Sequence, residues 1–406
     1  MKETKLESGE RNGNGVTGKI VLLSKKIVHR HQSLFIRCII CIVSILSLQN
    51  THAQTIDSLH FLGEYTVPFD APFRGTIIGG LSGIDYDPAR GVYYLISDDR
   101  SEVNPARFYT ARVYVSPKGI DSVRFTNVTT LRDKDGKPYP SSKLDPAHAP
   151  DPEALRYDPT RNRMVWSSEG ERIVKPGRIV LEDPTVIAVS PKGYLVDTFA
   201  IPDPVRMHAE PYGPRQNSVF EGVAFADHYR SLYVTVEEPL YQDGPQAGLR
   251  DTVTWTRIIR YDVRTRQPVA QYAYHPEPIA RPASPPDAFK INGIPDIMSL
   301  GDGKFLVLER SFSVGHLACT IRVFLTDLSQ ASDISGIASL KEQPPARPAV
   351  KKLLLNMDSL GIYIDNIEGV TFGPRLPNGH KTLVFVADNN FNPLQKSQFL
   401  LFEVMP

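Results

Sequence analysis

Acidic side chains recur at matching places in five pairs of short β-rich segments. The first segment of each pair begins with a polar or acidic residue, and these residues are Ser82, Glu153, Glu221, Asp296 and Glu368. The second segment ends with one or two acids, which are Asp98 and Asp99, Glu169, Glu237 and Glu238, Glu309, and Asp388. In a β-hairpin the start of the first strand lies beside the end of the second. Each pair of segments therefore predicts a place where acidic side chains meet.

Carboxylates that gather in one place repel one another, so protons, cations or arginines must neutralise some of them. A cluster of hard oxygen ligands favours Ca²⁺ over Mg²⁺, which demands a stricter octahedral geometry. We predict a calcium site whose ligands are Asp98, Asp99, Glu169, Glu237, Glu309 and Asp388. We predict that the catalytic residues are Glu153, Glu221, Glu368 and Arg310, although the pattern does not separate a ligand from a general base.

Two arginines directly follow an acidic segment end. Arg100 and Arg310 can bind the oxygens of a phosphate group, or they can simply pair with the neighbouring carboxylates. A purely structural interpretation also stays open for each acid, because Asp and Glu at strand ends often cap turns or accept backbone N–H bonds.

The segment pairs predict the fold. Gly83 to Asp98, Ala154 to Glu169 and Gly222 to Glu237 are each separated by 15 residues, as expected of a repeated hairpin. Two more strand-like segments follow most hairpins, so that four strands recur about every 70 residues. This pattern predicts an all-β chain that forms a single β-propeller with about five four-stranded blades, with six as the alternative.

The two ends of the repeat region predict how the ring closes. After the fifth hairpin only one strand remains, at 399–404, and a further strand is available near the start, at 59–67. Pairing these two strands would complete the last blade and cover a sheet edge.

The first 53 residues differ from the rest and indicate export. Lys25, Lys26 and Arg30 precede a mainly apolar segment at 34–48, and Thr51-His52-Ala53 resembles a signal-peptidase site. We therefore divide the chain into a polar extension with a signal peptide (1–53) and a propeller domain (54–406). The domain is expected in the periplasm or outside the cell, with no membrane span in the mature chain; an uncleaved N-terminal anchor is the alternative.

Charge and cysteine content limit the remaining choices. Residues 54–406 carry 38 basic and 42 acidic side chains, without the basic face that a nucleic-acid-binding protein needs. Cys319 is the only cysteine in this part, so no intrachain disulfide can form within it. The sequence also lacks a Gly-x-Ser-x-Gly elbow, a His-Glu-x-x-His zinc motif and a Walker loop.

The hairpins resemble the phytase-like family, described as the "esterase-like activity of phytase" domain. The matching pieces are spread in order over roughly 60–406, and they are Leu81-Ser-Gly-Ile-Asp-Tyr-Asp-Pro88, Ser97-Asp-Asp-Arg100, Asp151-Pro-Glu-Ala154, Ser168-Glu-Gly170, Phe220-Glu-Gly222, Leu306-Val-Leu-Glu-Arg310, Ile367-Glu-Gly369 and Ala387-Asp-Asn-Asn390. The chain departs from the family pattern at Ala154, where Gly is preferred, and at Asp296, which replaces the usual Glu-Gly start. The resemblance implies phosphoester hydrolysis, with the recurrent acids as the active groups.

Three functional hypotheses follow. The first is a Ca²⁺-dependent phosphoesterase that acts on a phosphorylated small molecule as a monomer. The second is a non-catalytic propeller that binds a ligand or a protein and uses its acids to hold a structural ion. The third is a hydrolase of carboxylic esters or lactones. The fold does not decide among them, because propellers host many functions.

Overall fold

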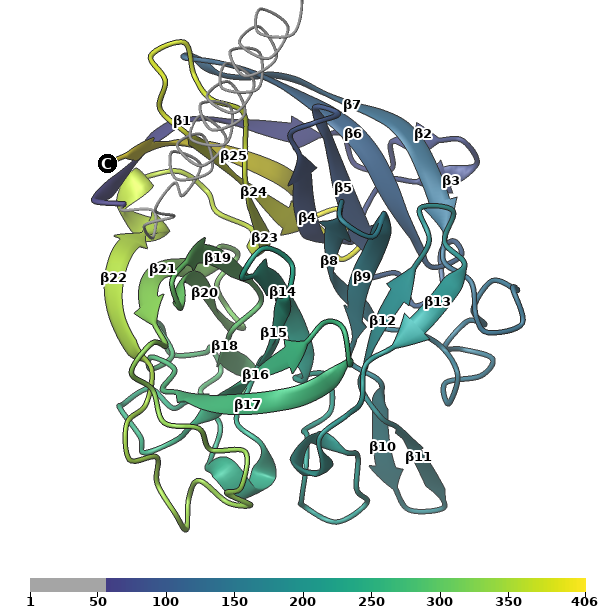
Figure 1. Ribbon diagram of the computed structural model, residues 1–406, viewed down its shortest axis with the longest axis vertical. Coiled ribbons are helices and arrows are strands. Elements are labelled where there is room, and N and C mark those ends of the chain that lie inside the picture. The colour runs from purple at the N-terminus through teal and green to yellow at the C-terminus, as the bar shows by residue number, and fades with distance from the viewer. Residues whose placement is uncertain (1–55) are drawn as a thin grey trace, which may run out of the picture. The chain divides into compact units, whose positions relative to one another are not determined.

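Each predicted repeat forms one antiparallel sheet, and five such sheets are arranged around a central axis as the blades of a β-propeller (Figure 1). The computed structural model describes residues 56–406. The predicted signal peptide and its cleavage site therefore lie outside the described residues. Within 56–406, no helix has both the length and the apolar character that a membrane span requires.

The first three blades follow one another along the chain. From the innermost strand outward, blade 1 contains β4 (Leu81–Asp87), β5 (Val92–Ser97), β6 (Arg107–Ser116) and β7 (Gly119–Thr130). Blade 2 contains β8 (Pro152–Asp158), β9 (Arg163–Ser168), β12 (Thr185–Val189) and β13 (Leu195–Thr198). Blade 3 contains β14 (Phe220–Ala226), β15 (Ser231–Val236), β16 (Thr256–Asp262) and β17 (Gln267–Tyr274).

The last two blades depart from this plain order. Blade 4 has a divided inner strand, and its members are β18 (Lys290–Gly293), β19 (Ile297–Gly301), β20 (Lys304–Ser313), β21 (Thr320–Asp327) and β22 (Val350–Asn356). Blade 5 contains β23 (Asn366–Phe372), β24 (Thr382–Asp388), β25 (Ser397–Met405) and, as its outermost strand, β1 (Ser58–Val67). The predicted closure is therefore confirmed, because the first strand pairs with the last.

Smaller elements lie in the segments that connect the blade strands. Two hairpins interrupt the connections, and they are β2 (Pro72–Phe73) with β3 (Thr76–Ile77) and β10 (Glu171–Lys175) with β11 (Arg178–Glu182). Three short 3₁₀ turns are η1 (Asp203–Val205), η2 (Tyr241–Asp243) and η3 (Met357–Leu360).

Burial explains why inner and outer strands differ in sequence. β24 is buried at every position, and its segment Leu383–Ala387 is entirely apolar. The reason is that neighbouring blades cover both faces of the inner strands. The outer strand β1 instead alternates between exposed and less exposed positions, as expected of a strand with one face toward solvent.

The apolar cores lie between the blades. Five clusters of buried side chains each combine residues of two adjacent blades, so every blade packs on both of its neighbours. For example, Trp166 of blade 2 packs in one cluster with Phe108 of blade 1. Five blade-to-blade cores in a closed circuit leave no place for the sixth blade that we kept as an alternative.

A buried ion pair joins the inner strands near the axis. Arg156 of β8 donates hydrogen bonds to Asp296, at 2.7 and 2.8 Å, and to the carbonyl oxygen of Ile84, at 2.8 Å. Asp296 in turn accepts a hydrogen bond from the backbone N–H of Val370, at 2.8 Å. These contacts connect four of the five blades. Asp296, which begins the fourth hairpin in sequence, thus pairs with Arg156 in the interior of the ring.

Candidate functional site

β-Bulges position the acids that begin the hairpins. In four blades the pairing of the inner strand shifts by one residue at the same place, between Leu81 and Gly83, Pro152 and Leu155, Phe220 and Val223, and Ile367 and Gly369. Glu153, Glu221 and Glu368 lie at three of these irregularities. A bulge bends its strand and redirects the side chain at the extra residue. The repeated acids therefore share a local backbone feature as well as a sequence position.

The acids that follow or end the second strands complete the group. We use "acidic cluster" for the carboxyl groups of Asp98, Asp151, Glu153, Glu169, Glu221, Glu237, Glu368 and Asp388. All of these residues are buried except Asp98, which is partly buried. Most of the predicted site residues are thus brought together, from blades 1, 2, 3 and 5.

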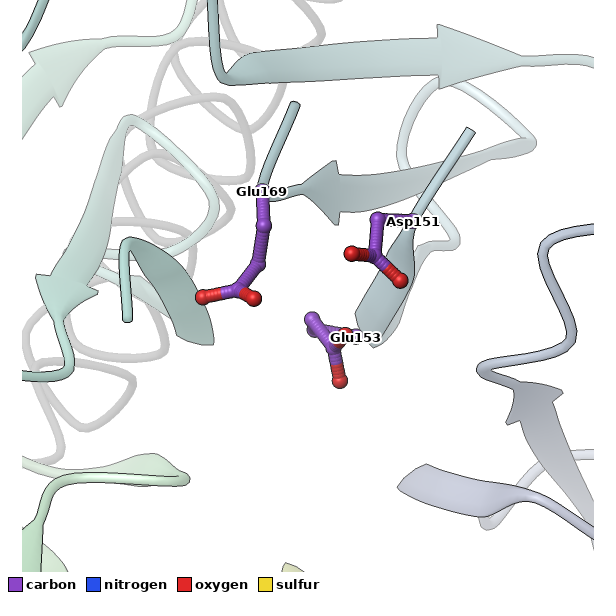
Figure 2. A group of neighbouring side chains, drawn as sticks. All are labelled: Asp151, Glu153 and Glu169. Atoms are coloured by element: carbon purple, nitrogen blue, oxygen red, sulfur yellow. The ribbon is translucent and has the colours of Figure 1, made fainter. Parts of the chain in front are cut away.

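Two groups of three carboxylates are close enough to share a cation. Oxygen atoms of Asp151, Glu153 and Glu169 lie within 4.8 Å of one another, and so do those of Glu169, Glu221 and Glu237. Figure 2 shows the carboxylates of the first group converging on a common space. Glu169 belongs to both groups and therefore occupies the centre of the site.

Glu169 also carries an unpaired oxygen. One carboxylate oxygen accepts a hydrogen bond from the backbone N–H of Val219, whereas Oε2 is buried and has no hydrogen-bond partner among the described residues. Burial of an unpaired carboxylate oxygen is costly unless a proton or a cation compensates for it. The carboxylate oxygens of the two groups suit a hard cation such as Ca²⁺. The residues present therefore fit the ion that the sequence predicts.

Burial and mutual repulsion shift the cluster toward its protonated form. Burial raises the pKa of Glu169 well above its ordinary value, and the nearby Asp151 and Glu237 raise it further. The same effect of burial, partly opposed by Arg310, raises the pKa of Glu237 to about 7 and that of Glu368 to about 8. In the absence of a cation, the cluster thus competes for protons near neutral pH.

Arg310 is the principal positive charge inside the cluster. Its Nη2 donates to Glu237 at 2.6 Å, and its Nη1 donates to Glu368 at 2.8 Å and to Asn366 at 2.6 Å. Its Nε is buried without a hydrogen-bond partner in the described part of the chain. Arg310 therefore pairs with two acids and keeps one donor without a partner among the described residues, and a phosphate contact for it stays a prediction.

Arg100 lies at the edge of the site. It donates to Glu171 at 2.9 Å, and its Nε lies 3.5 Å from a carboxylate oxygen of Asp151. Its side chain is 22% exposed. Arg100 thus pairs with carboxylates next to the first group of three, and a phosphate contact for it stays a prediction.

Two of the predicted ligands lie elsewhere, and we correct their assignment. Asp99 accepts hydrogen bonds from three backbone N–H groups of the following loop and forms an ion pair of 2.7 Å with Arg107. Glu309 accepts from Lys351 at 2.6 Å, from Tyr274 at 2.8 Å and also from Asn292.

The reason for the Glu309 error is a matter of strand geometry. β20 continues past Glu309 because β18 pairs with its second half. Side chains alternate between the two faces of a strand, so Arg310 points to the acidic cluster and Glu309 points away from it. The prediction for Asp99 fails for a local reason, because its carboxylate accepts the backbone N–H groups of the loop that leads into β6.

One member of the cluster was missed as a site residue. Asp151 precedes β8 and lies two residues before Glu153. Both belong to the segment Asp151-Pro-Glu-Ala154, which is one of the pieces that resemble the phytase-like family. Residues two apart in an extended chain share a face, so this spacing was the available signal. Asn366, two residues before Glu368, follows the same rule and contacts both Glu368 and Arg310.

The fold and the site together define a five-bladed propeller whose inner strands gather buried carboxylates around a place for a cation. A family model described as phytase-like, "esterase-like activity of phytase", matches residues 76–391. The chain belongs to this phytase-like family, as its hairpins predicted.

Several solved structures resemble this chain only weakly. An exo-β-1,3-galactanase from Phanerochaete chrysosporium is 11% identical, with a TM-score of 0.43 over 85% of this chain and 65% of that one. An α-L-arabinofuranosidase from Lactobacillus brevis is 10% identical, with a TM-score of 0.43 over 80% and 91%. A periplasmic gluconolactonase from Pseudomonas aeruginosa is 10% identical, with a TM-score of 0.33 over 83% and 92%. Similarity this low carries no argument about function. No curated protein gives a significant match.

Proposed function

We propose that the protein is a Ca²⁺-dependent phosphoesterase whose reaction takes place at the acidic cluster. The observation that carries this proposal is the pair of carboxylate groups that share Glu169, whose buried Oε2 has no partner among the described residues. Membership of the phytase-like family supports hydrolysis of phosphate esters as the reaction. We also propose, from the N-terminal sequence, that the protein is exported.

The residues of the two groups would hold the cation: Asp151, Glu153, Glu169, Glu221 and Glu237. A bound Ca²⁺ would supply positive charge against the phosphoryl oxygens, which is the usual contribution of a metal to this chemistry. Arg310 would add hydrogen bonds to the same oxygens, because an arginine fork matches phosphate geometry.

Glu368 is the best candidate for the general base. It lies outside both groups of three, and Arg310 and Asn366 hold its carboxylate in place. Its pKa of about 8, raised first of all by burial, suits a group that accepts a proton near neutral pH. In the reaction, water would attack phosphorus, the ester P–O bond would break, Glu368 would take one proton of the water, and that proton would then pass to the oxygen of the departing alcohol.

The test separates metal binding from proton transfer. Phosphate release from simple monoesters and from phytate is measured with Ca²⁺ and with EDTA, on the wild-type protein and on Glu169→Gln and Glu368→Gln. We expect EDTA to abolish release. We expect Glu368→Gln to lower kcat by about 100-fold or more while Ca²⁺ still raises its melting temperature. Glu169→Gln should lose both activity and the Ca²⁺-induced rise.

The matched control is Glu342→Gln, which changes an exposed glutamate in the loop before β22. It should behave as the wild type does. Absence of any Ca²⁺-dependent phosphate release, in a protein that Ca²⁺ still stabilises, would contradict the proposal and leave a metal-stabilised binding propeller. Turnover of carboxylic esters or lactones under the same conditions, measured as acid release, would favour the third hypothesis.

A further inference from the structure

A cavity of about 360 Å³ opens beside the acidic cluster. Arg310, Glu237 and Asn366 line it, so it is continuous with the proposed phosphate site. Loops of blade 4 and the loop after β24 of blade 5 supply most of the rest of its wall. A group attached to a phosphate at Arg310 can therefore enter this cavity directly.

Large apolar side chains lie on the wall of the cavity among polar ones. Phe289, Leu317 and Leu394 are 61%, 76% and 75% exposed, and all three line the cavity together with Phe312. Large apolar side chains that are exposed side by side commonly mark a binding surface. Their position next to Arg310 distinguishes them from scattered surface residues.

The cavity carries little positive charge. Apart from His316, Arg310 is the only basic residue on its described wall, and Glu237 and Glu368 already balance its guanidinium. A ligand with several phosphates would need several arginines or lysines around it. The wall therefore suits a ligand with one phosphate group. Although the wall also carries neutral amides, its Phe and Leu side chains offer contacts for an apolar group attached to that phosphate.

We propose that the preferred substrates are phosphate monoesters of apolar alcohols, with an aromatic or branched aliphatic group held by Phe289, Leu317 and Leu394. This inference rests on the proposed function, which supplies the phosphate site. The size of the cavity lies near the lower end of the usual range for small-molecule sites, so it suits about one aromatic ring with its linker. Inositol polyphosphates are then poor substrates, in spite of the family description.

The test compares substrates whose leaving groups have similar reactivity. We expect kcat/KM with Ca²⁺ to be about tenfold or more higher for 2-phenylethyl phosphate than for ethyl phosphate, because the cavity buries the ring. Phytate should fall below both on a per-phosphate basis. Leu394→Ser should reduce the preference for the phenyl substrate, and Leu394→Lys should shift the preference toward phytate.

Leu144→Ser is the matched control, because Leu144 is 87% exposed and does not line the cavity. It should leave the preference unchanged. Equal kcat/KM for the phenyl and ethyl substrates, or a preference that Leu394→Ser does not alter, would overturn this inference while the phosphoesterase itself stands.

A binding measurement keeps the inference testable if no phosphate ester is turned over. Calorimetry in the presence of Ca²⁺ compares 2-phenylethylphosphonate with ethylphosphonate, neither of which can be hydrolysed at the P–C bond by this chemistry. Tighter binding of the phenyl compound, weakened by Leu394→Lys, supports the cavity assignment even then. Equal or absent binding of both compounds overturns it.

Discussion

Arg156 illustrates how a single side chain can hold a ring of blades together. Its guanidinium is buried, pairs with the equally buried Asp296, and donates to the carbonyl oxygen of Ile84 in another blade. Burial raises the pKa of Asp296, and Arg156 opposes that rise most strongly among the neighbouring groups. The pair thus keeps a carboxylate charged where water cannot reach it.

We predict that Arg156→Met lowers the free energy of unfolding by about 3–5 kcal/mol, because it leaves Asp296 buried without its partner. Urea denaturation at neutral pH measures this loss. The double variant Arg156→Met with Asp296→Asn should recover part of it, since an asparagine oxygen can still accept from Val370. Arg178→Met, at an exposed position of the β10–β11 hairpin, serves as the control. A loss below about 1 kcal/mol for Arg156→Met would show that the pair does not join the blades.

At the scale of the strands, the glycine after a hairpin acid permits adjacent inner strands to approach. A Cβ atom on Gly222 would lie 2.7 Å from the Cα of Asp296 in the next blade, and one on Gly369 would lie 3.1 Å from the backbone N of Ile84. Backbone atoms cannot move aside as the end of a flexible side chain can. The Glu-Gly pairs of blades 3 and 5 therefore combine a functional acid with a packing requirement.

We predict that Gly222→Ala destabilises the protein by about 1–3 kcal/mol through overpacking between blades 3 and 4. Thermal or urea unfolding measures the change. Gly336→Ala provides the control, because nothing lies within 4 Å of its Cβ position, and it should change stability by less than about 0.5 kcal/mol. Equal effects of the two substitutions would rule out the close approach as the reason for the glycine.

The strands also show how far the sequence could predict the structure. Three hairpins of equal spacing and the spare strand near each end sufficed to predict the blade pattern and its closure, because both depend on local strand signals and on sheet edges that need covering. The site was predictable where an acid directly follows the second strand of a hairpin with the common spacing, as at Glu169 and Glu237. It was not predictable at Glu309, since the divided inner strand of blade 4 carries β20 further and presents Arg310 instead.

At the scale of the whole molecule, ring closure makes the acidic cluster unavoidable. The cores between all neighbouring blades and the β1–β25 pairing fix the inner strands, so the carboxylates cannot move apart to relieve their repulsion. The chain must then neutralise them where they lie, with the few arginines present, with protons or with a cation. Stability should therefore depend on pH and on Ca²⁺ in a linked way.

The sign of this dependence follows from the pKa values. Burial, as the largest effect, raises the pKa of Asp151 and Asp388 from 3.8 to about 6, that of Glu237 from 4.5 to about 7, and that of Glu368 from 4.5 to about 8. Each group keeps its proton to a higher pH in the folded chain than in the unfolded chain. The folded state therefore binds more protons between about pH 4 and pH 8, and the free energy of unfolding falls as pH rises through that window.

We predict that the melting temperature of the Ca²⁺-free protein is lower at pH 8 than at pH 5, and that Ca²⁺ raises it much more at pH 8, where the ion competes with fewer protons. At about 100 times its Kd, Ca²⁺ at one site should contribute about 2.7 kcal/mol. Differential scanning calorimetry with EDTA and with Ca²⁺ at both pH values measures this linkage. In Glu169→Gln the Ca²⁺ effect at pH 8 should largely vanish, because both carboxylate groups lose their shared member. If the Ca²⁺-free protein instead becomes more stable from pH 5 to pH 8, the prediction is wrong. The carboxylates of the acidic cluster would then be ionised in the folded state, with arginines alone balancing their charge.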